Sequence, residues 1–332
     1  TLARLRNRDP VFRRLEGPDG ITVYQPPVYL PSAYRPGWLS RWFRSRRLAQ
    51  ARKYLLRQGC DKIVLYVWRP KYANALELVP HDASVYHIVD EYSFSQEDPP
   101  TSEEELGLIR SADELIVHSP ALMDKKGRGG STSYIPNGVD YHAFSTSCAE
   151  PVDLEGIPRP RIGYCGYLKH QLDWDLLTEL IERHSQYSWV FVGALAHKDL
   201  AGRIEDLDGR PYVHFLGGKT SQELACYPQH FDVCIMPYTQ DAYTRYIFPL
   251  KLHEYLASGR PTVGTPIRSL LEYEEIIELA DGIDGWSRAL ERSLAAAAST
   301  PERVEERRQV ARAFDWDTLA DQVDELLGDA VR

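Results

Sequence analysis

Residues 248–264 read FPLKLHEYLASGRPTVG, and this stretch predicts a helix followed directly by a buried strand. Pro249 suits the first turn of a helix, where its missing N–H costs nothing. Gly259 suits the position just past the helix end, because glycine adopts a left-handed backbone conformation without strain. The β-branched run over 261–264 then predicts a short strand.

The same alternation of short apolar runs and helical stretches continues along the chain. Strands are predicted at 21–25, 63–68, 85–89, 114–118, 161–165, 188–192, 212–216, 233–236 and 261–264. Helices are predicted around 40–57, 102–110, 120–126, 174–184, 220–226 and 249–258. Such alternation is typical of parallel sheets covered by crossover helices. We therefore expect an α/β protein with doubly wound, Rossmann-like sheets.

Length and composition predict two domains. A chain of 332 residues exceeds what one hydrophobic core usually supports. The stretch 145–160 is rich in Ser, Pro and Gly and predicts a linker, so the expected domains are 1–150 and 151–332. The second should end in a helix over 316–327, capped by an aspartate. The first does not open with the usual strand, Gly-rich turn and helix, so its first βα unit is expected to be missing or reduced.

The cysteines and the apolar runs predict a soluble chain. The five cysteines are scattered and show no metal-ligand spacing, which indicates reduced packing residues in a cytoplasmic protein. No apolar run approaches the roughly 20 residues that span a bilayer, and nothing at the start resembles a signal peptide. Hydrophobic residues at 43% argue against global disorder.

Charge is unevenly distributed along a chain whose net charge is −9. Residues 1–60 hold twelve arginines and one lysine against three acids, which predicts a local anionic partner. Within them, 36–57 interleaves tryptophans with arginines, as interfacial helices do, so we expect peripheral membrane contact there. A solvated basic helix is the alternative, because the apolar positions form no clean stripe. Nucleic acid is not expected, since no nucleic-acid module is recognised.

Lys251 and Glu254 are the first candidate site residues. Ligands of open α/β sheets bind at the carboxyl ends of strands, beside helix N-termini. Three residues apart, this pair shares one face near the start of the predicted helix. A lysine there suits a diphosphate, and a carboxylate one turn later can accept hydrogen bonds from two ribose hydroxyls. The alternative is an exposed ion pair on an amphipathic helix.

Five segments in order resemble the landmarks of GT-B glycosyltransferases. They are 117–122 (VHSPAL), 135–140 (IPNGVD), 162–166 (IGYCG), 190–193 (VFVG) and 249–263 (PLKLHEYLASGRPTV). Each is weak alone, whereas the ordered set is specific. The resemblance implies two Rossmann-like domains facing a central cleft. It also implies a hexosyltransferase (EC 2.4) that transfers a sugar from a nucleotide-diphosphate donor, expected to be a UDP-sugar, to a saccharide or lipid-linked acceptor.

By this resemblance the second domain supplies the donor site. Lys251 would contact the diphosphate and Glu254 the ribose. The other donor-binding residues that it implies are Gly166, Tyr167, Tyr238, Arg245, Pro249 and Leu250. For Gly166 an ordinary strand-end turn, and for Tyr238 a packing role, remain alternatives. No cofactor is implied.

Two departures from the commonest pattern point to a subgroup. Many retaining relatives carry a second glutamate eight residues before Glu254, where this chain has Tyr246. The usual Arg and Lys after the first C-terminal strand are replaced by GYLKHQLDWD, in which Lys169 could hold a phosphate. The pattern resembles the teichuronic-acid and xanthan-type polysaccharide glycosyltransferases and argues against a retaining mechanism.

Asp90 and Glu91 follow the predicted strand at 85–89 and are the candidate catalytic residues. A carboxylate at that edge could take the proton from an acceptor hydroxyl. We expect Asp90 to be the base, with Glu91 second, and hence an inverting transfer. A cap on the next helix, or an ion pair with an arginine, is the alternative reading of these acids.

Three DxD strings, at 173–175, 206–208 and 315–317, have the spacing of carboxylate pairs that hold a divalent cation. At least two of them precede predicted helices, so capping explains them better and no metal is expected.

An epimerase on the same fold and a non-catalytic sugar- or nucleotide-binding homologue remain alternatives. A glycoside hydrolase is disfavoured, because it needs no diphosphate site.

Overall fold

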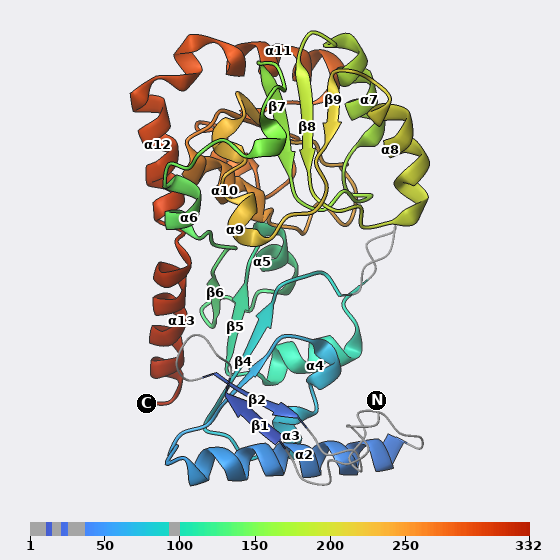
Figure 1. Ribbon diagram of the computed structural model, residues 1–332. Helices are drawn as coiled ribbons and strands as arrows, with labels where there is room; N and C mark the ends of the chain where they lie inside the picture. Colours follow the sequence, from blue (N-terminus) through green and yellow to red (C-terminus); the bar gives the residue numbers. More distant parts are fainter. Residues whose placement is uncertain (1–10, 15–20, 26–36, 93–99) are drawn as a thin grey trace.

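The computed structural model describes residues 11–14, 21–25, 37–92 and 100–332, and two parallel sheets organise it (Figure 1). The N-terminal sheet has the strand order β3-β4-β5-β6, with β3 (Val64–Val67), β4 (Ala83–Ile88), β5 (Glu114–Val117) and β6 (Thr132–Tyr134). The C-terminal sheet has the order β12-β11-β10-β7-β8-β9, with β7 (Arg161–Cys165), β8 (Ser188–Val192), β9 (Val213–Phe215), β10 (Val233–Met236), β11 (Thr262–Gly264) and β12 (Glu278–Leu279). Adjacent strands are parallel throughout both sheets. The expected α/β fold is confirmed.

Helices precede, connect and follow these strands. In the N-terminal half they are α2 (Gly37–Arg57), η1 (Pro70–Tyr72), α3 (Ala75–Leu78), α4 (Glu103–Ser111) and α5 (Pro120–Lys126). In the C-terminal half they are α6 (Tyr141–Ser145), η2 (Val152–Leu154), α7 (Trp174–Arg183), η3 (Lys198–Leu200), α8 (Ala201–Asp208), α9 (Ser221–Leu224), η4 (Pro228–His230), α10 (Leu250–Ser258), η5 (Leu271–Tyr273), α11 (Gly282–Leu294), η6 (Ala296–Ser299), α12 (Pro301–Arg312) and α13 (Trp316–Ala330). Among the described residues, no helix combines the length and the apolar surface needed to cross a bilayer.

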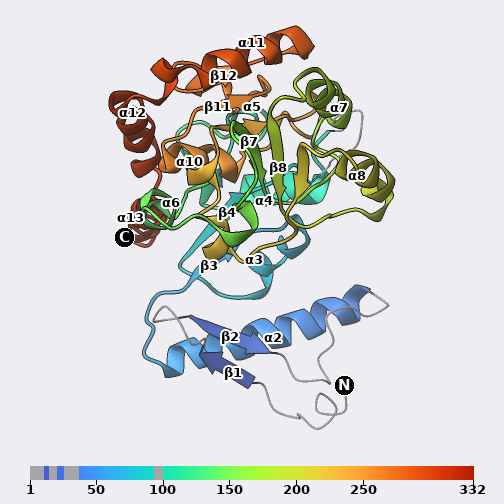
Figure 2. The same ribbon diagram turned by 45° about the horizontal axis from the view of Figure 1, so that its top comes forward.

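One predicted strand belongs to a different sheet. The run at 21–25 forms β2 (Thr22–Gln25), but it pairs antiparallel with β1 (Val11–Arg14) rather than joining the doubly wound sheet. Figure 2 shows this pair lying along α2, where the Tyr24 hydroxyl donates to Gln50 at 2.6 Å. Periodicity identifies a strand but not its partner, so this expectation was wrong in topology.

Several elements were not predicted. Strands β6 and β12 are three and two residues long, too short for a periodic signal. Helices α8, α11 and α12 lie in stretches for which no element was expected.

Helix α12 lies beside the C-terminal half of the molecule, and α13, which follows it, lies beside the N-terminal half (Figure 1). It follows the C-terminal domain in sequence, yet Leu319 packs in a cluster with Val85 and Ile116 of the N-terminal sheet. Conversely, Val139 and Phe144 belong to the C-terminal core. Packing therefore does not follow the expected division at residue 150.

Hydrogen bonds to backbone carbonyls join the two halves beside α10. Ser119 Oγ donates to the carbonyl of Tyr246 at 2.7 Å, and Asn137 Nδ2 donates to that of Phe248 at 2.8 Å. Burial lowers the pKa of His253 to about 4, although the hydrogen bond between its Nδ1 and the Asn137 carbonyl acts to raise it. The neutral ring can therefore donate from Nδ1 to the Asn137 carbonyl. The segment that enters α10 is thus anchored to the N-terminal half.

Candidate active site

The first turn of α10 lies against the carboxyl end of β7. Pro249 precedes the helix with extended backbone angles, and Gly259 ends it with φ at +77°. Leu252, Tyr255 and Leu256 form the buried face of the helix. The backbone N–H of Cys165 donates to the Tyr255 hydroxyl at 2.8 Å, which ties the helix to the strand end.

Lys251 occupies a space that only glycine leaves open. Its Nζ lies 5.0 Å from the centre of the Tyr164 ring, a cation–π distance. A Cβ added at Gly166, where φ is +129°, would lie 2.6 Å from Lys251 Cε and Nζ. Burial acts to lower the pKa of Lys251, but Tyr164, Tyr238 and Glu254 outweigh it, and the net pKa is raised. The lysine is therefore a fixed cation at the end of β7.

Glu254 lies one turn further along α10 and is partly buried. Burial raises the pKa of its carboxyl, and the positive charge of Lys251 opposes that rise. No residue that the structure describes donates a hydrogen bond to this carboxylate. Both oxygens remain available as acceptors beside a cation.

The other predicted donor residues surround this pair to different extents. Tyr238 is buried just after β10; burial raises the pKa of its hydroxyl, and the positive charge of Lys251 opposes that rise. Tyr167 is 65% exposed, and its carbonyl accepts a hydrogen bond from Tyr164. Arg245 is exposed on the segment between β10 and α10, and Leu250 is exposed at the first position of α10.

Asp90 follows β4 and is the acid that approaches the C-terminal half. Burial raises the pKa of its carboxyl, while the Glu91 N–H, which donates to it at 2.9 Å, and Arg69 act to lower it. Burial raises the pKa of Tyr243, and the charge of Asp90 adds to this rise. At Lys169 the charge of Asp90 opposes a net lowering of the pKa. Asp90 of the N-terminal half thus interacts electrostatically with Lys169 of the C-terminal half.

Glu91 has a different environment, although it is adjacent in sequence. It is 3% exposed and pairs with Lys126 at 3.1 Å and Lys125 at 3.2 Å. Lys126 also pairs with Glu105 at 2.7 Å, and the Tyr86 hydroxyl donates to Glu105. These residues form a buried ion cluster inside the N-terminal half. These ion pairs favour a structural role for Glu91. We assign no catalytic role to this residue.

Three residues of this region were not predicted: Tyr164, Tyr243 and Arg69. Tyr164 lies in a fully buried strand and was indistinguishable from a packing residue. Tyr243 and Arg69 lie in loops, whose positions periodicity cannot supply. Lys169 was noted only as a substitute phosphate ligand. Burial and the charge of Lys251 lower its pKa, and Asp90 opposes this.

The DxD strings are explained by helix ends. Asp173 accepts a hydrogen bond from the Leu176 N–H at the start of α7, and Asp315 accepts one from the Asp317 N–H at the start of α13. The string at 206–208 lies in the last turn of α8. Capping is confirmed for the first and the third.

Replacing Glu91 by Gln should destabilise the protein, whereas Asp90→Asn should not. Lys126 would keep its ion pair with Glu105 but lose the one with residue 91. We therefore expect the free energy of unfolding to fall by about 1.5–3 kcal/mol, the scale of a hydrogen bond to a charged group. Thermal and urea unfolding of both variants measures this. An Asp90→Asn protein that is less stable than Glu91→Gln would contradict the division of roles.

Comparison with known proteins finds one family match and one similar sequence. Residues 159–300 match the family described as "Glycosyl transferases group 1". A putative teichuronic acid biosynthesis glycosyltransferase, TuaH of Bacillus subtilis (strain 168), is 32% identical over 237 residues, which is 68% of this chain and 59% of the relative. The chain thus spans about three fifths of that relative's length.

Solved structures share the fold at low identity. Anabaena HepE, in complex with UDP and glucose, has a TM-score of 0.61 and 19% identity, covering 85% of this chain and 81% of its own. A trehalose-6-phosphate synthase studied for transfer with retention has a TM-score of 0.69 and 13% identity, covering 98% and 90%. S. aureus TarM has a TM-score of 0.60 and 16% identity, covering 84% and 58%. The chain therefore has the GT-B fold, and its residues 159–300 match the glycosyl transferases group 1 family.

Proposed function

We propose that this protein is a glycosyltransferase whose donor, a UDP-sugar, binds where β7 meets α10. The observation that carries the proposal is Lys251, a partly buried cation whose place depends on Gly166. The lysine would meet the diphosphate, helped by Lys169, and Glu254 would accept the ribose hydroxyls. Tyr238 and Tyr167 would line the pocket, while Pro249 and Leu250 set the entry to the helix. The UDP bound by HepE and the name of TuaH support this choice of donor.

In the reaction that we propose, Asp90 is the general base. An acceptor oxygen attacks the anomeric carbon, the bond from that carbon to the diphosphate oxygen breaks, and UDP leaves. The acceptor proton passes to Asp90, whose raised pKa suits that task. Direct displacement inverts the anomeric carbon. The lysines would neutralise the leaving group, so no metal is required in this scheme.

The acceptor is proposed to be a saccharide or a lipid-linked sugar, met by the cytoplasmic enzyme at a membrane surface. Helix α2 supports this, because Trp38, Trp42, Arg46, Lys53 and Leu56 are exposed at helical spacing along one face. Trp38 is 70% exposed, and Arg46 lies 5.2 Å from the Trp42 ring centre.

The rest of α2 is fixed to the domain. Arg44 donates to Asn74, Arg41 pairs with Glu77 at 2.8 Å, and Arg52 donates to the Pro80 carbonyl. A mixed aromatic and basic face on a docked helix suits an anionic lipid surface.

UDP should raise the thermal midpoint of the chain by mass action, and the shift should survive EDTA.

Lys251→Ala should weaken UDP binding by about 1–3 kcal/mol, because a charged hydrogen bond is lost. Gly166→Ala should also weaken it, by displacing the lysine. Gly156→Ala is the matched control, since Gly156 also has positive φ but no neighbour within 4 Å of an added Cβ. Unchanged UDP affinity, measured by calorimetry on Lys251→Ala, would remove this site.

Asp90→Asn should leave UDP binding intact and lower the rate of sugar transfer by about 10²–10⁴-fold. Because the base must be ionised and its pKa is raised, the rate of the unmodified enzyme should fall as the pH drops through a value above the usual 3.9 or so of an aspartate. That acid limb should vanish in Asp90→Asn. NMR of the product's anomeric configuration is the second readout, and retention would exclude Asp90 as the base of a direct displacement.

Vesicles of anionic phospholipid should sediment with the protein at low salt and release it at high salt. Trp38→Ala/Trp42→Ala should reduce the bound fraction, whereas Trp316→Ala, at an exposed tryptophan on α13, should not. Equal binding to neutral and anionic vesicles, or none at all, would refute the proposed membrane face.

A further inference from the structure

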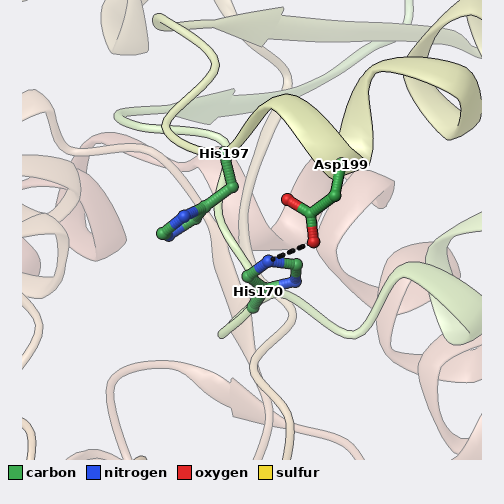
Figure 3. Close-up of side chains that lie close together, drawn as sticks. All are labelled: His170, His197 and Asp199. Carbon is green, nitrogen blue, oxygen red and sulfur yellow. Dashed lines mark ion pairs between the residues drawn. The ribbon is translucent and has the colours of Figure 1, made fainter.

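A second chemical cluster lies beyond the candidate donor site, at the same edge of the C-terminal sheet. It consists of His170, His197 and Asp199, all exposed, with one ligand atom from each within 4.8 Å of the others. His170 comes from the loop after β7, and the other two come from the segment after β8 that enters η3. Figure 3 shows the three side chains converging from these two segments.

The backbone fixes the two segments relative to each other. Leu168 donates to the Ala194 carbonyl at 3.0 Å, and Ala196 donates to the Leu168 carbonyl at 2.9 Å. Leu168 and Leu195 also form an isolated parallel bridge, which prolongs the β7–β8 pairing. The cluster therefore stands on an extension of the sheet and not on two independent loops.

The side-chain geometry is close to that of a bound metal. His170 Nε2 lies 3.1 Å from Asp199 Oδ2, which is the separation of two neighbouring ligands whose bonds to one ion are each about 2.0–2.2 Å. The His170 and His197 rings are 4.6 Å apart and inclined by 33°. The ligand atom of His197 lies within 4.8 Å of those of His170 and Asp199.

We propose that His170, His197 and Asp199 bind one divalent transition-metal ion, with Zn²⁺ as the representative. Two imidazoles and one carboxylate match the ligand preference of zinc and its neighbours rather than that of Mg²⁺ or Ca²⁺. Exposure leaves the remaining coordination positions to water. The ion would clamp the loop after β7, which carries Tyr167 and Lys169, to η3. This site is separate from Lys251 and does not depend on the proposed transfer reaction.

The sequence did not predict this site. Its ligands are separated by more than one element, and only His197 and Asp199 are close along the chain. No metal is expected from the sequence, because helix capping explains the DxD strings better than metal binding does. The third ligand, His170, joins them only because the ends of β7 and β8 are adjacent in the folded sheet.

Calorimetric titration of the metal-free full chain with Zn²⁺, without nucleotide, tests the proposal. We expect one saturable site, and Co²⁺ should give the visible absorption of a protein-bound ion. His170→Ala and His197→Ala should each weaken Zn²⁺ binding on the order of 100-fold or more, since losing a ligand should cost at least as much as losing an outer-shell partner. His142→Ala, at another exposed histidine, should change nothing.

The result is independent of whether the chain is a transferase. The thermal midpoint of metal-free His197→Ala should match that of the unmodified chain, and its UDP response should persist. Absence of a saturable site, or binding that is equal in His197→Ala and His142→Ala, would overturn the metal site. Loss of UDP binding in Lys251→Ala with Zn²⁺ binding intact would show the two sites to be separate.

Discussion

The close approach between the start of α10 and the end of β7 is the constraint on which the candidate site depends. Tyr255 accepts the N–H of Cys165, and Gly166 leaves the space that Lys251 occupies. The neighbouring strand end is equally restricted, because a Cβ at Gly193 would lie 1.9 Å from the Gly166 carbonyl oxygen. The lysine is thus positioned by backbone packing at the sheet edge, as well as by its own side-chain conformation.

The charges near the two sheets serve different purposes. Glu91 and Glu105 are buried in the N-terminal half and pair with Lys125 and Lys126, so removal of one partner would leave a buried charge uncompensated. The charges of Asp90 and Lys169 are only partly compensated by their neighbours. Burial raises the pKa of the Asp90 carboxyl and lowers the pKa of the Lys169 ammonium. Titratable groups perturbed in this way are typical of functional sites. The adjacent acids Asp90 and Glu91 therefore have different electrostatic environments.

The relative position of the two sheets is set by elements that cross between them. Helix α13 carries Leu319 from the C-terminal end of the chain onto the N-terminal sheet, and Ser119 and Asn137 bind the backbone just before α10. Tyr246, which stands where many retaining relatives have a glutamate, is buried in the N-terminal core. Tyr246 therefore packs against the N-terminal half and contributes to the contact between the two halves.

The sequence by itself determined the α/β class, most of the strands and the limits of α10. These follow from local signals: periodicity, the proline and glycine at the helix ends, and the order of the glycosyltransferase-like segments. Tertiary structure decided that β2 pairs with β1, that α13 returns to the first sheet, and that Asp90 rather than Glu91 lies near Lys169. It also brought His170 to His197. The physical reason is that a side chain's burial and charge environment depend on residues distant in sequence, which no local pattern contains.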